Sequence, residues 1–373
     1  MKRTISTLAG AALALGAWST AGIAKDLVFA SPFPPVHALN RFAIEPTIKA
    51  INAESGGKLT FKFVPGGQLF GLQESLPSLG SRVADASVFL SMMFPGQLKS
   101  HLITTDMFLV HDDPLVVSAA ATETIMKDCP DCFEEFKKSS TIFLAGYSTT
   151  NYQLMCKNDL KTLADFKGKK IKVSSVWGTL VTAMGAVPVN IPAAETVEAL
   201  QRGLVDCQMS PPEWLVSYPG MDEAVSYIVD YGFGIGSGVT LFVMNLDSWK
   251  SLGKDEKTLV LKHMPMASAG IMVTGYDAYH ARAKEAVEKR KIQITKAGAD
   301  FQAMMTEFRK TSVANAVERA KKRGVADPQK IADTYIANVA KWEKLLANTP
   351  RTADGYSKAL WDNLYSKFDP EKL

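Results

Sequence analysis

The sequence predicts an α/β protein with two units, each a sheet of mainly parallel strands covered by helices. Three observations lead to this prediction. Strand-like and helix-like patterns alternate over residues 27–90, and the same alternation returns over residues 141–208. A long amphipathic helix pattern follows at residues 268–296. Strands that alternate with helices are typical of parallel sheets, because a parallel connection needs a crossover segment that covers the sheet.

Length and composition fit a globular protein of about two domains. The chain has 373 residues, of which 47% are hydrophobic and 21% are charged. Its formal net charge of +4 is too small to indicate a nucleic acid or another polyanion as partner. We therefore expect a protein that buries sizeable cores and binds no nucleic acid.

The first 24 residues have the pattern of a secretory signal peptide. Lys2 and Arg3 give a positive start, an apolar stretch covers residues 8–18, and small residues follow up to Ala24. The apolar stretch is shorter than the roughly 20 residues that a membrane helix needs. We expect the mature chain to work in the periplasm, away from the cytosolic nucleotide cofactors.

The first unit is expected to comprise residues 25–148 and 238–280. Isoleucines at helical spacing predict a helix that Gly56 and Gly57 end. Apolar and polar residues then alternate, as in a half-buried strand. The strands predicted for this unit span residues 27–30, 59–63, 83–90, 141–147 and 239–244, and its helices lie near residues 44–51 and 72–79.

The second unit is expected to comprise residues 149–237 and part of 281–373, including the long helix and the C-terminal helices. Gly203 ends one helix pattern, and a strand pattern follows it. The strands predicted for this unit span residues 152–155, 171–173 and 205–208, and its helices lie near residues 180–184 and 195–202.

The long helix predicted at residues 268–296 has one apolar face. Tyr276, Tyr279, Ala283 and Ala286 recur at helical spacing, and charged side chains occupy the opposite face. At about 1.5 Å per residue such a helix is roughly 40 Å long. We expect it to brace both units.

No enzyme motif is complete in this sequence. The histidines are scattered and form no HExxH pair. The glycine-rich run at residues 232–238 completes neither a dinucleotide-binding nor a Walker pattern, and GxSxG is absent. Glycines let a backbone flex or pack tightly, which fits a crossover between two units. The sequence predicts a hinge there, and it predicts no cofactor, no metal and no catalysis.

Four cysteines remain after the predicted signal peptide. Cys129 and Cys132 have the spacing of a redox motif, which would indicate an extracytoplasmic thiol oxidoreductase. The same spacing fits a local structural disulfide, which we favour for an oxidising compartment. The pairing of Cys156 and Cys207 is left open by the sequence.

Two long blocks of the sequence resemble a known family. The blocks are "GGKLTFKFVPGGQLFGLQESLPSLGSRVADAS" and "DLKTLADFKGKKIKV" through "GAVPVNIPAAETVEALQRGLVDCQMSPPEW". They resemble the two lobes of the DctP-type substrate-binding proteins of tripartite ATP-independent periplasmic (TRAP) transporters. The resemblance implies two α/β lobes that close on a small solute and deliver it to membrane permease subunits. The sequence leaves the oligomeric state open between a monomer and a homodimer.

The resemblance implies three polar ligand-binding residues. Family members that bind organic acids usually hold the carboxylate with an arginine, and the matching position here is Lys172. A second common arginine matches Tyr152, and a ligand-binding asparagine matches Ser210. Lysine attracts an anion as a point charge without the planar fork of arginine. These departures argue against a C4-dicarboxylate ligand.

Aromatic residues lie in or beside the segments that resemble the walls of the cleft. As a group they favour an aromatic or hydrophobic monocarboxylate, because ring faces bury apolar area and stack. Polar residues in loops of the first lobe are also expected to face the ligand. The aromatic candidates are Tyr152, Trp177, Trp214, Tyr218 and Phe233, and the candidates from the first lobe are His37, Glu74 and Ser91.

Two further alternatives stay open. The aromatic faces, together with Glu213 or Glu74, would form a cage for an amine. A sensor-associated binding protein would use the same cleft but pass its signal to a receptor domain instead of a permease.

Overall fold

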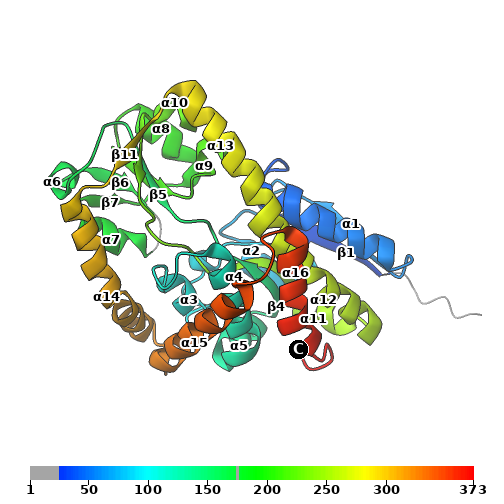
Figure 1. Ribbon diagram of the computed structural model, residues 1–373. Coiled ribbons are helices and arrows are strands. Elements are labelled where there is room, and N and C mark those ends of the chain that lie inside the picture. Colours follow the sequence, from blue (N-terminus) through cyan, green and yellow to red (C-terminus); the bar gives the residue numbers. More distant parts are fainter. Residues whose placement is uncertain (1–24, 174–175) are drawn as a thin grey trace, which may run out of the picture.

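The computed structural model describes residues 25–173 and 176–373, and it contains two β-sheets with helices packed on their faces (Figure 1). The predicted α/β fold class with two lobes is therefore confirmed. The predicted signal peptide at residues 1–24 lies outside the described residues. Among the described residues, no helix combines the length and the apolar character that crossing a membrane requires.

The first sheet forms the centre of what we call the first lobe. Its strand order is β2-β1-β3-β10-β4. β1 is parallel to β2 and β3, and β10 is antiparallel to β3 and β4. The carboxyl ends of β1, β2, β3 and β4 therefore lie at one edge of the sheet. The strands are β1 (Lys25–Ala30), β2 (Leu59–Val64), β3 (Ala86–Ser87), β4 (Thr141–Tyr147) and β10 (Val239–Asn245).

The second sheet forms the centre of the second lobe, with the order β11-β9-β5-β8-β6-β7. β6 is parallel to β7 and β8, whereas β5 is antiparallel to β8 and β9. The carboxyl ends of β6, β8 and β9 thus share an edge with the start of β5. The strands are β5 (Gln153–Cys156), β6 (Lys170–Lys172), β7 (Val187–Val189), β8 (Cys207–Ser210), β9 (Tyr227–Asp230) and β11 (Gln293–Lys296).

Two segments connect the sheets at these carboxyl edges, residues 148–152 between β4 and β5 and residues 231–238 between β9 and β10. They pair with each other through backbone hydrogen bonds: the Tyr152 N–H donates to the carbonyl of Gly234 over 2.9 Å, and the Phe233 N–H donates to the carbonyl of Tyr152 over 2.9 Å. The predicted glycine-rich crossover is therefore present. Gly234 has φ +94°, and a Cβ there would collide with the backbone oxygen of Phe108, so this position requires glycine for close packing.

Helices cover both sheets. Those of the first half are α1 (Glu45–Glu54), α2 (Ser75–Gly80), α3 (Leu102–Asp106), α4 (Pro114–Glu123), α5 (Pro130–Lys138), α6 (Leu163–Phe166), α7 (Trp177–Ala183) and α8 (Thr196–Gln201). The later ones are α9 (Trp214–Ser217), α10 (Met221–Ala224), α11 (Leu246–Ser251), α12 (Lys254–Ala269), α13 (Tyr276–Arg290), α14 (Ala299–Lys322), α15 (Pro328–Leu346) and α16 (Ala353–Asn363).

The long helix predicted at residues 268–296 is correct in its apolar face and wrong at both ends. A continuous helical run starts at Lys254 and ends at Arg290, since Lys291 adopts a left-handed conformation with φ 55°. The next residues form strand β11 instead of further helix. Tyr276 and Tyr279 pack in the core of the first lobe and Ala283 in that of the second, so the run does brace both lobes.

A second bracing helix, α14, was not anticipated. Its Phe301 and Met305 pack in the core of the second lobe, and its Ala316 and Val317 pack in the core of the first. Figure 1 shows α14 running from the second lobe towards α15. The helices α15 and α16 also contribute buried residues to the first core, which corrects our assignment of the C-terminal helices to the second unit.

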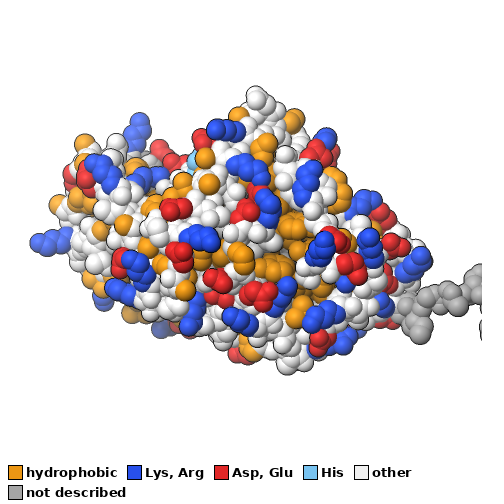
Figure 2. Space-filling model, turned by 90° about the horizontal axis from the view of Figure 1, so that it is seen from below, with side chains coloured by type: hydrophobic (Ala, Val, Ile, Leu, Met, Phe, Trp, Pro, Cys, Tyr) orange, Lys and Arg blue, Asp and Glu red, His pale blue; other side chains and the backbone are white. Residues whose placement is uncertain are grey.

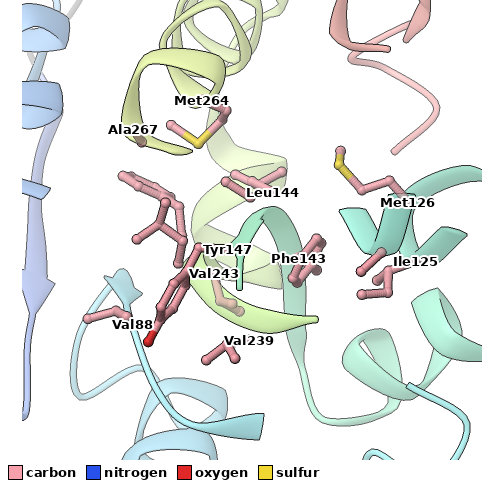
Figure 3. Close-up of a cluster of buried hydrophobic side chains, with 14 of the residues drawn as sticks. Val88, Ile125, Met126, Phe143, Leu144, Tyr147, Val239, Val243, Met264 and Ala267 are labelled. Carbon is pink, nitrogen blue, oxygen red and sulfur yellow. The ribbon is translucent and has the colours of Figure 1, made fainter. Parts of the chain in front are cut away.

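The core of the first lobe forms around the neighbouring strands β4 and β10, whose residues are all buried. Figure 3 shows Phe143, Leu144 and Tyr147 of β4 beside Val243 of β10, with Met264 of α12 above them. Strands that are buried on both faces are apolar along their whole length. The predicted strand at residues 83–90 is shorter than expected, since only Ala86–Ser87 pair as β3.

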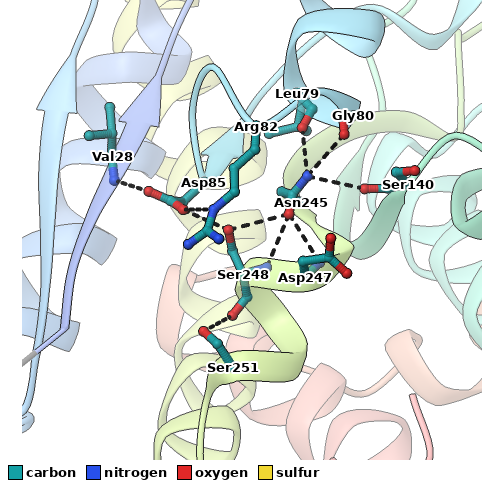
Figure 4. Close-up of polar contacts among 10 residues, drawn as sticks. All are labelled: Val28, Leu79, Gly80, Arg82, Asp85, Ser140, Asn245, Asp247, Ser248 and Ser251. Carbon is teal, nitrogen blue, oxygen red and sulfur yellow. Dashed lines mark hydrogen bonds and ion pairs between the residues drawn. The ribbon is translucent and has the colours of Figure 1, made fainter.

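A hydrogen-bond network fixes the far end of β10, opposite the carboxyl edge (Figure 4). The Asn245 amide donates to the carbonyl of Leu79 over 2.9 Å, and its oxygen accepts from the backbone N–H of Ser248 over 3.0 Å at the start of α11. The Ser248 hydroxyl donates to Asp85 over 2.6 Å, and Asp85 in turn accepts from the Val28 N–H of β1. The network ties β1, the start of β3 and the end of β10 together at the edge opposite the crossover segments.

Candidate functional site

The carboxyl edges of the two sheets face the crossover segments and gather most of the predicted ligand-binding residues. Lys172 ends β6, Ser210 ends β8, and Tyr152 immediately precedes β5. From the first sheet, Tyr147 ends β4. In open α/β sheets, ligands bind outside the carboxyl ends of the strands, because the loops there diverge. The topology thus places the candidate site between the lobes.

Lys172 is buried at this edge, with only 2% of its surface exposed. It lies beside Gln208 in the register of β6 and β8, and its Nζ is 4.8 Å from the ring centre of Trp214. Burial lowers the pKa of Lys172 to about 8, because the charged form loses hydration. A bound anion beside Nζ would offset that loss.

Tyr152 and Trp177 form a stack, with ring centroids 4.1 Å apart and planes 6° from parallel. The Trp177 Nε1–H donates to the carbonyl of Phe233 over 2.9 Å in the crossover segment. The three rings belong to the core of the second lobe, and those of Trp177 and Phe233 are fully buried. Trp177 and Phe233 therefore support Tyr152 and the crossover from behind.

Glu213 lies three residues beyond the end of β8, directly before α9, and is 7% exposed. Its Oε2 accepts a hydrogen bond from the Thr150 hydroxyl over 2.8 Å and lies 3.5 Å from Nε2 of His280 on α13. The hydrogen bond to Glu213 raises the pKa of His280. The carboxylate is thus held between a crossover segment and a bracing helix.

Tyrosines surround Glu213. Burial raises the pKa values of Tyr147, Tyr152 and Tyr276, and the charge of Glu213 acts on all three in the same direction. Burial raises the pKa of Tyr218 to about 12. The Tyr276 hydroxyl donates to the carbonyl of Ser148 over 2.7 Å.

Sequence reasoning missed several of these neighbours, namely Tyr147, Thr150, Tyr276 and His280. The sequence does show that Tyr276 and His280 are four residues apart, which places them on one face of a helix. In the structure their rings stack. Nothing in the sequence connects that face to Glu213, which is far away along the chain.

The other predicted ligand-binding residues have separate surroundings. Ser91 is buried and its hydroxyl donates to the carbonyl of Gly238 over 3.2 Å. The ring of His37 stacks on Phe33 at 4.5 Å, and burial lowers the pKa of His37 to about 4. Glu74 is exposed just before α2. Within the described ranges, no hydrogen bond joins them to Glu213 or Tyr152.

Ser210 is 1% exposed at the end of β8. Its hydroxyl makes only a long contact of 3.4 Å with the carbonyl of Pro211. Ser210 pairs with Gln153 in the register of β5, directly beside Tyr152. The structure thus brings Lys172, Tyr152, Ser210, Glu213 and Trp214 to one edge of the second sheet.

All four cysteines form disulfides. Cys129 is joined to Cys132 at the start of α5, and Cys156 is joined to Cys207 across the register of β5 and β8. Cys129 is 3% exposed and Cys132 is fully buried. Thiol exchange requires access of an attacking thiolate to the sulfur, so this burial gives no support to an oxidoreductase.

Solved structures with similar folds are solute receptors. A TRAP solute-binding protein from a marine metagenome, specific for aromatic acids, superimposes with TM-score 0.73 at 21% identity over 85% of this chain and 99% of that chain. One from Rhodoferax ferrireducens, in complex with benzoate, gives TM-score 0.72 at 22% identity over 86% and 99%. One from Bordetella bronchiseptica, with mandelate, gives TM-score 0.70 at 22% identity over 85% and 99%.

A curated relative matches part of the chain. The monocarboxylate 2-oxoacid-binding periplasmic protein of Nostoc sp. is 27% identical over 146 residues, which is 38% of this chain and 38% of that protein. This chain thus matches less than two thirds of the relative's length. The relative is periplasmic, which agrees with the location that we predicted.

The family model for DctP, described as bacterial extracellular solute-binding protein, family 7, matches residues 34–319. This range includes both sheets except β1, both crossover segments and every candidate ligand-binding residue discussed above. The predicted resemblance is confirmed: the chain belongs to the DctP family, family 7 of the bacterial extracellular solute-binding proteins.

Proposed function

We propose that this protein is a periplasmic receptor that binds a small aromatic or hydrophobic monocarboxylate between its lobes and delivers it to the permease of a TRAP transporter. The observation that carries the proposal is Lys172, a buried ammonium at the carboxyl edge of the second sheet, beside the ring of Trp214. Carboxylates bind strongly to such a group, because a low-dielectric environment strengthens the attraction.

The neighbours of Lys172 favour one carboxylate with an apolar body. Tyr152, Trp214 and Tyr218 offer ring faces at this edge, and the rings of Trp214 and Tyr218 lie 4.5 Å apart. Rings stack on flat apolar ligands. A dicarboxylate would bring a second charge close to Glu213, which repels it.

The relatives support this class of ligand. Three of the similar receptors bind benzoate, mandelate or other aromatic acids, and the curated relative binds monocarboxylate 2-oxoacids. An amine alone in an aromatic cage is less favoured, because the ammonium of Lys172 would repel it. On the face in Figure 2, positive and negative side chains are interspersed, which agrees with a small solute as ligand.

Binding is proposed to close the lobes about the two crossover segments. A solute that touches both sheets binds the closed state better than the open state, so it shifts the population towards closure. The closed form then presents a surface that the permease recognises.

A thermal-shift panel tests this function. We expect benzoate or mandelate to raise the melting temperature, whereas succinate and choline leave it unchanged. A ligand at a hundred times its Kd stabilises the folded state by about 2.7 kcal/mol. The proposal is wrong if every monocarboxylate is inactive at millimolar concentration while an amine or a dicarboxylate gives a clear shift.

A further inference from the structure

We propose that Glu213 and the tyrosine hydroxyls around it bind a second polar group of the ligand, so that the preferred acid carries a hydroxyl or an ammonium group. Both groups donate hydrogen bonds to a carboxylate, and the experiment below distinguishes them. The inference rests on the proposed function, because it assumes that Lys172 holds the carboxylate of the ligand.

The first observation is the unequal use of the two oxygens of Glu213. Oε2 accepts from Thr150 and lies near His280. Oε1 accepts no hydrogen bond from a residue in the described ranges, and it is not among the side-chain oxygens that are sealed from solvent. A donor on a ligand can therefore reach it. A hydrogen bond to an ionised oxygen is about twice as strong as one between neutral groups.

The second observation is a group of tyrosine hydroxyls beside this carboxylate. The hydroxyls of Tyr147, Tyr152 and Tyr218 donate to no residue in the part of the chain that the structure describes. The hydroxyl of Tyr276, by contrast, donates a hydrogen bond to the carbonyl of Ser148. Figure 3 shows the ring of Tyr147 with its hydroxyl pointing away from Met264.

These hydroxyls come from both lobes. Tyr147 ends β4 of the first sheet, and Tyr152 precedes β5 of the second. Thr150, which donates to Glu213 over 2.8 Å, lies in the crossover segment between these two tyrosines. A ligand group that contacts this cluster therefore touches both lobes at once and stabilises the closed state.

The aromatic pair of Trp214 and Tyr218 connects the two polar ends. The ring of Trp214 faces Nζ of Lys172 at 4.8 Å and the ring of Tyr218 at 4.5 Å. Trp214 also follows Glu213 directly in the chain. A flat ligand that lies on these rings would thus carry its carboxylate towards Lys172 and its donor towards Glu213. A substituted aromatic acid has this form.

Calorimetric titration with three acids of similar shape tests the inference. The probes are benzoate, meta-hydroxybenzoate and meta-aminomethylbenzoate. We expect one of the two substituted acids to bind about tenfold or more tightly than benzoate, since a hydrogen bond to a charged group contributes more than one between neutral groups. Which acid gains more identifies the donor as a hydroxyl or an ammonium group.

Two variants attribute that preference to the site. Glu213→Gln keeps the shape of the side chain and removes its charge, so the preference over benzoate should fall to about twofold or less. Tyr147→Phe removes only a hydroxyl and should reduce the same preference by a smaller factor. Glu198→Gln, an exposed glutamate of the same lobe that pairs with Arg202, should leave the preference unchanged.

Four results would overturn the inference. One is an equal preference for the substituted acid over benzoate in Glu213→Gln and in the unaltered protein, and another is that benzoate binds most tightly. In either case Glu213 does not bind a polar group of the ligand, while the proposed function stands. If a chelator abolishes binding of the acids, Glu213 holds a cation instead of a ligand donor. If no acid binds at all, the proposed function fails and the inference fails with it.

Discussion

Lys172→Met is expected to weaken the binding of benzoate or mandelate by about a hundredfold or more, to the point where calorimetry detects no heat. Methionine keeps the length of the side chain and its contact with Trp214, but it removes the ammonium. Removing one partner of a desolvated charge pair costs about 2–5 kcal/mol, and 1.4 kcal/mol corresponds to a factor of ten. The fold should survive, because replacing a buried charge by an apolar group of similar size is tolerated.

Matched variants separate this effect from a general loss of stability. Lys170→Met changes an exposed lysine of the same strand, two positions earlier, and should leave affinity unchanged. Lys172→Arg keeps the charge and should retain most of the binding. Circular dichroism confirms that each variant is folded. If Lys172→Met binds the acid as tightly as the unaltered protein, Lys172 is not the carboxylate-binding residue.

Acid binding is expected to fall steeply above pH 8. Burial lowers the pKa of Lys172 from 10.5 to about 8 in the absence of ligand, and only the protonated form attracts a carboxylate. The ligand therefore has to bind together with a proton once the pH exceeds this pKa. Each further pH unit should weaken the observed affinity about tenfold, until the pKa of the complex is reached. Below pH 8 the affinity should be nearly constant.

Titrations between pH 6 and pH 10 measure this profile, with benzoate as the probe. In Lys172→Arg the guanidinium stays charged over the whole range, so the fall above pH 8 should disappear from its profile. A profile that is flat in both proteins would show that the charge of Lys172 does not change in this range. A fall of equal size in both would assign it to another group.

Much of the fold could be predicted from the sequence. Strands β4 and β10 are mostly apolar runs, and such runs are informative because they are typical of strands that are buried on both faces. The apolar face of α13 was found from its spacing. Strand β11 was missed because it directly follows that helix pattern, and only the left-handed turn at Lys291 separates them.

The candidate site could be predicted in part. Lys172, Tyr152 and Ser210 were found through the resemblance of the surrounding segments to a family. Thr150 and His280 beside Glu213 could not be found in this way, because the three residues come from a crossover segment, a bracing helix and a strand end. Their proximity depends on how the two sheets face each other, which no local pattern encodes.

The same limit applies to the buried aromatic residues. Trp177 and Phe233 were expected to face the ligand, since they lie in segments that resemble cleft walls. The structure places both in the apolar core of the second lobe with Phe301. The spacing of residues alone does not tell which side of a strand end faces the other lobe. In addition, helix α14, which places Phe301 in this core, was not anticipated.

Small-angle X-ray scattering tests the central claim, which is that the two lobes close on a bound acid. The radius of gyration should be recorded without ligand and with a saturating amount of the acid that stabilises the protein most. We expect the radius to decrease with that acid and to stay unchanged with it in Lys172→Met. A radius that is the same with and without a tightly bound acid would contradict the account.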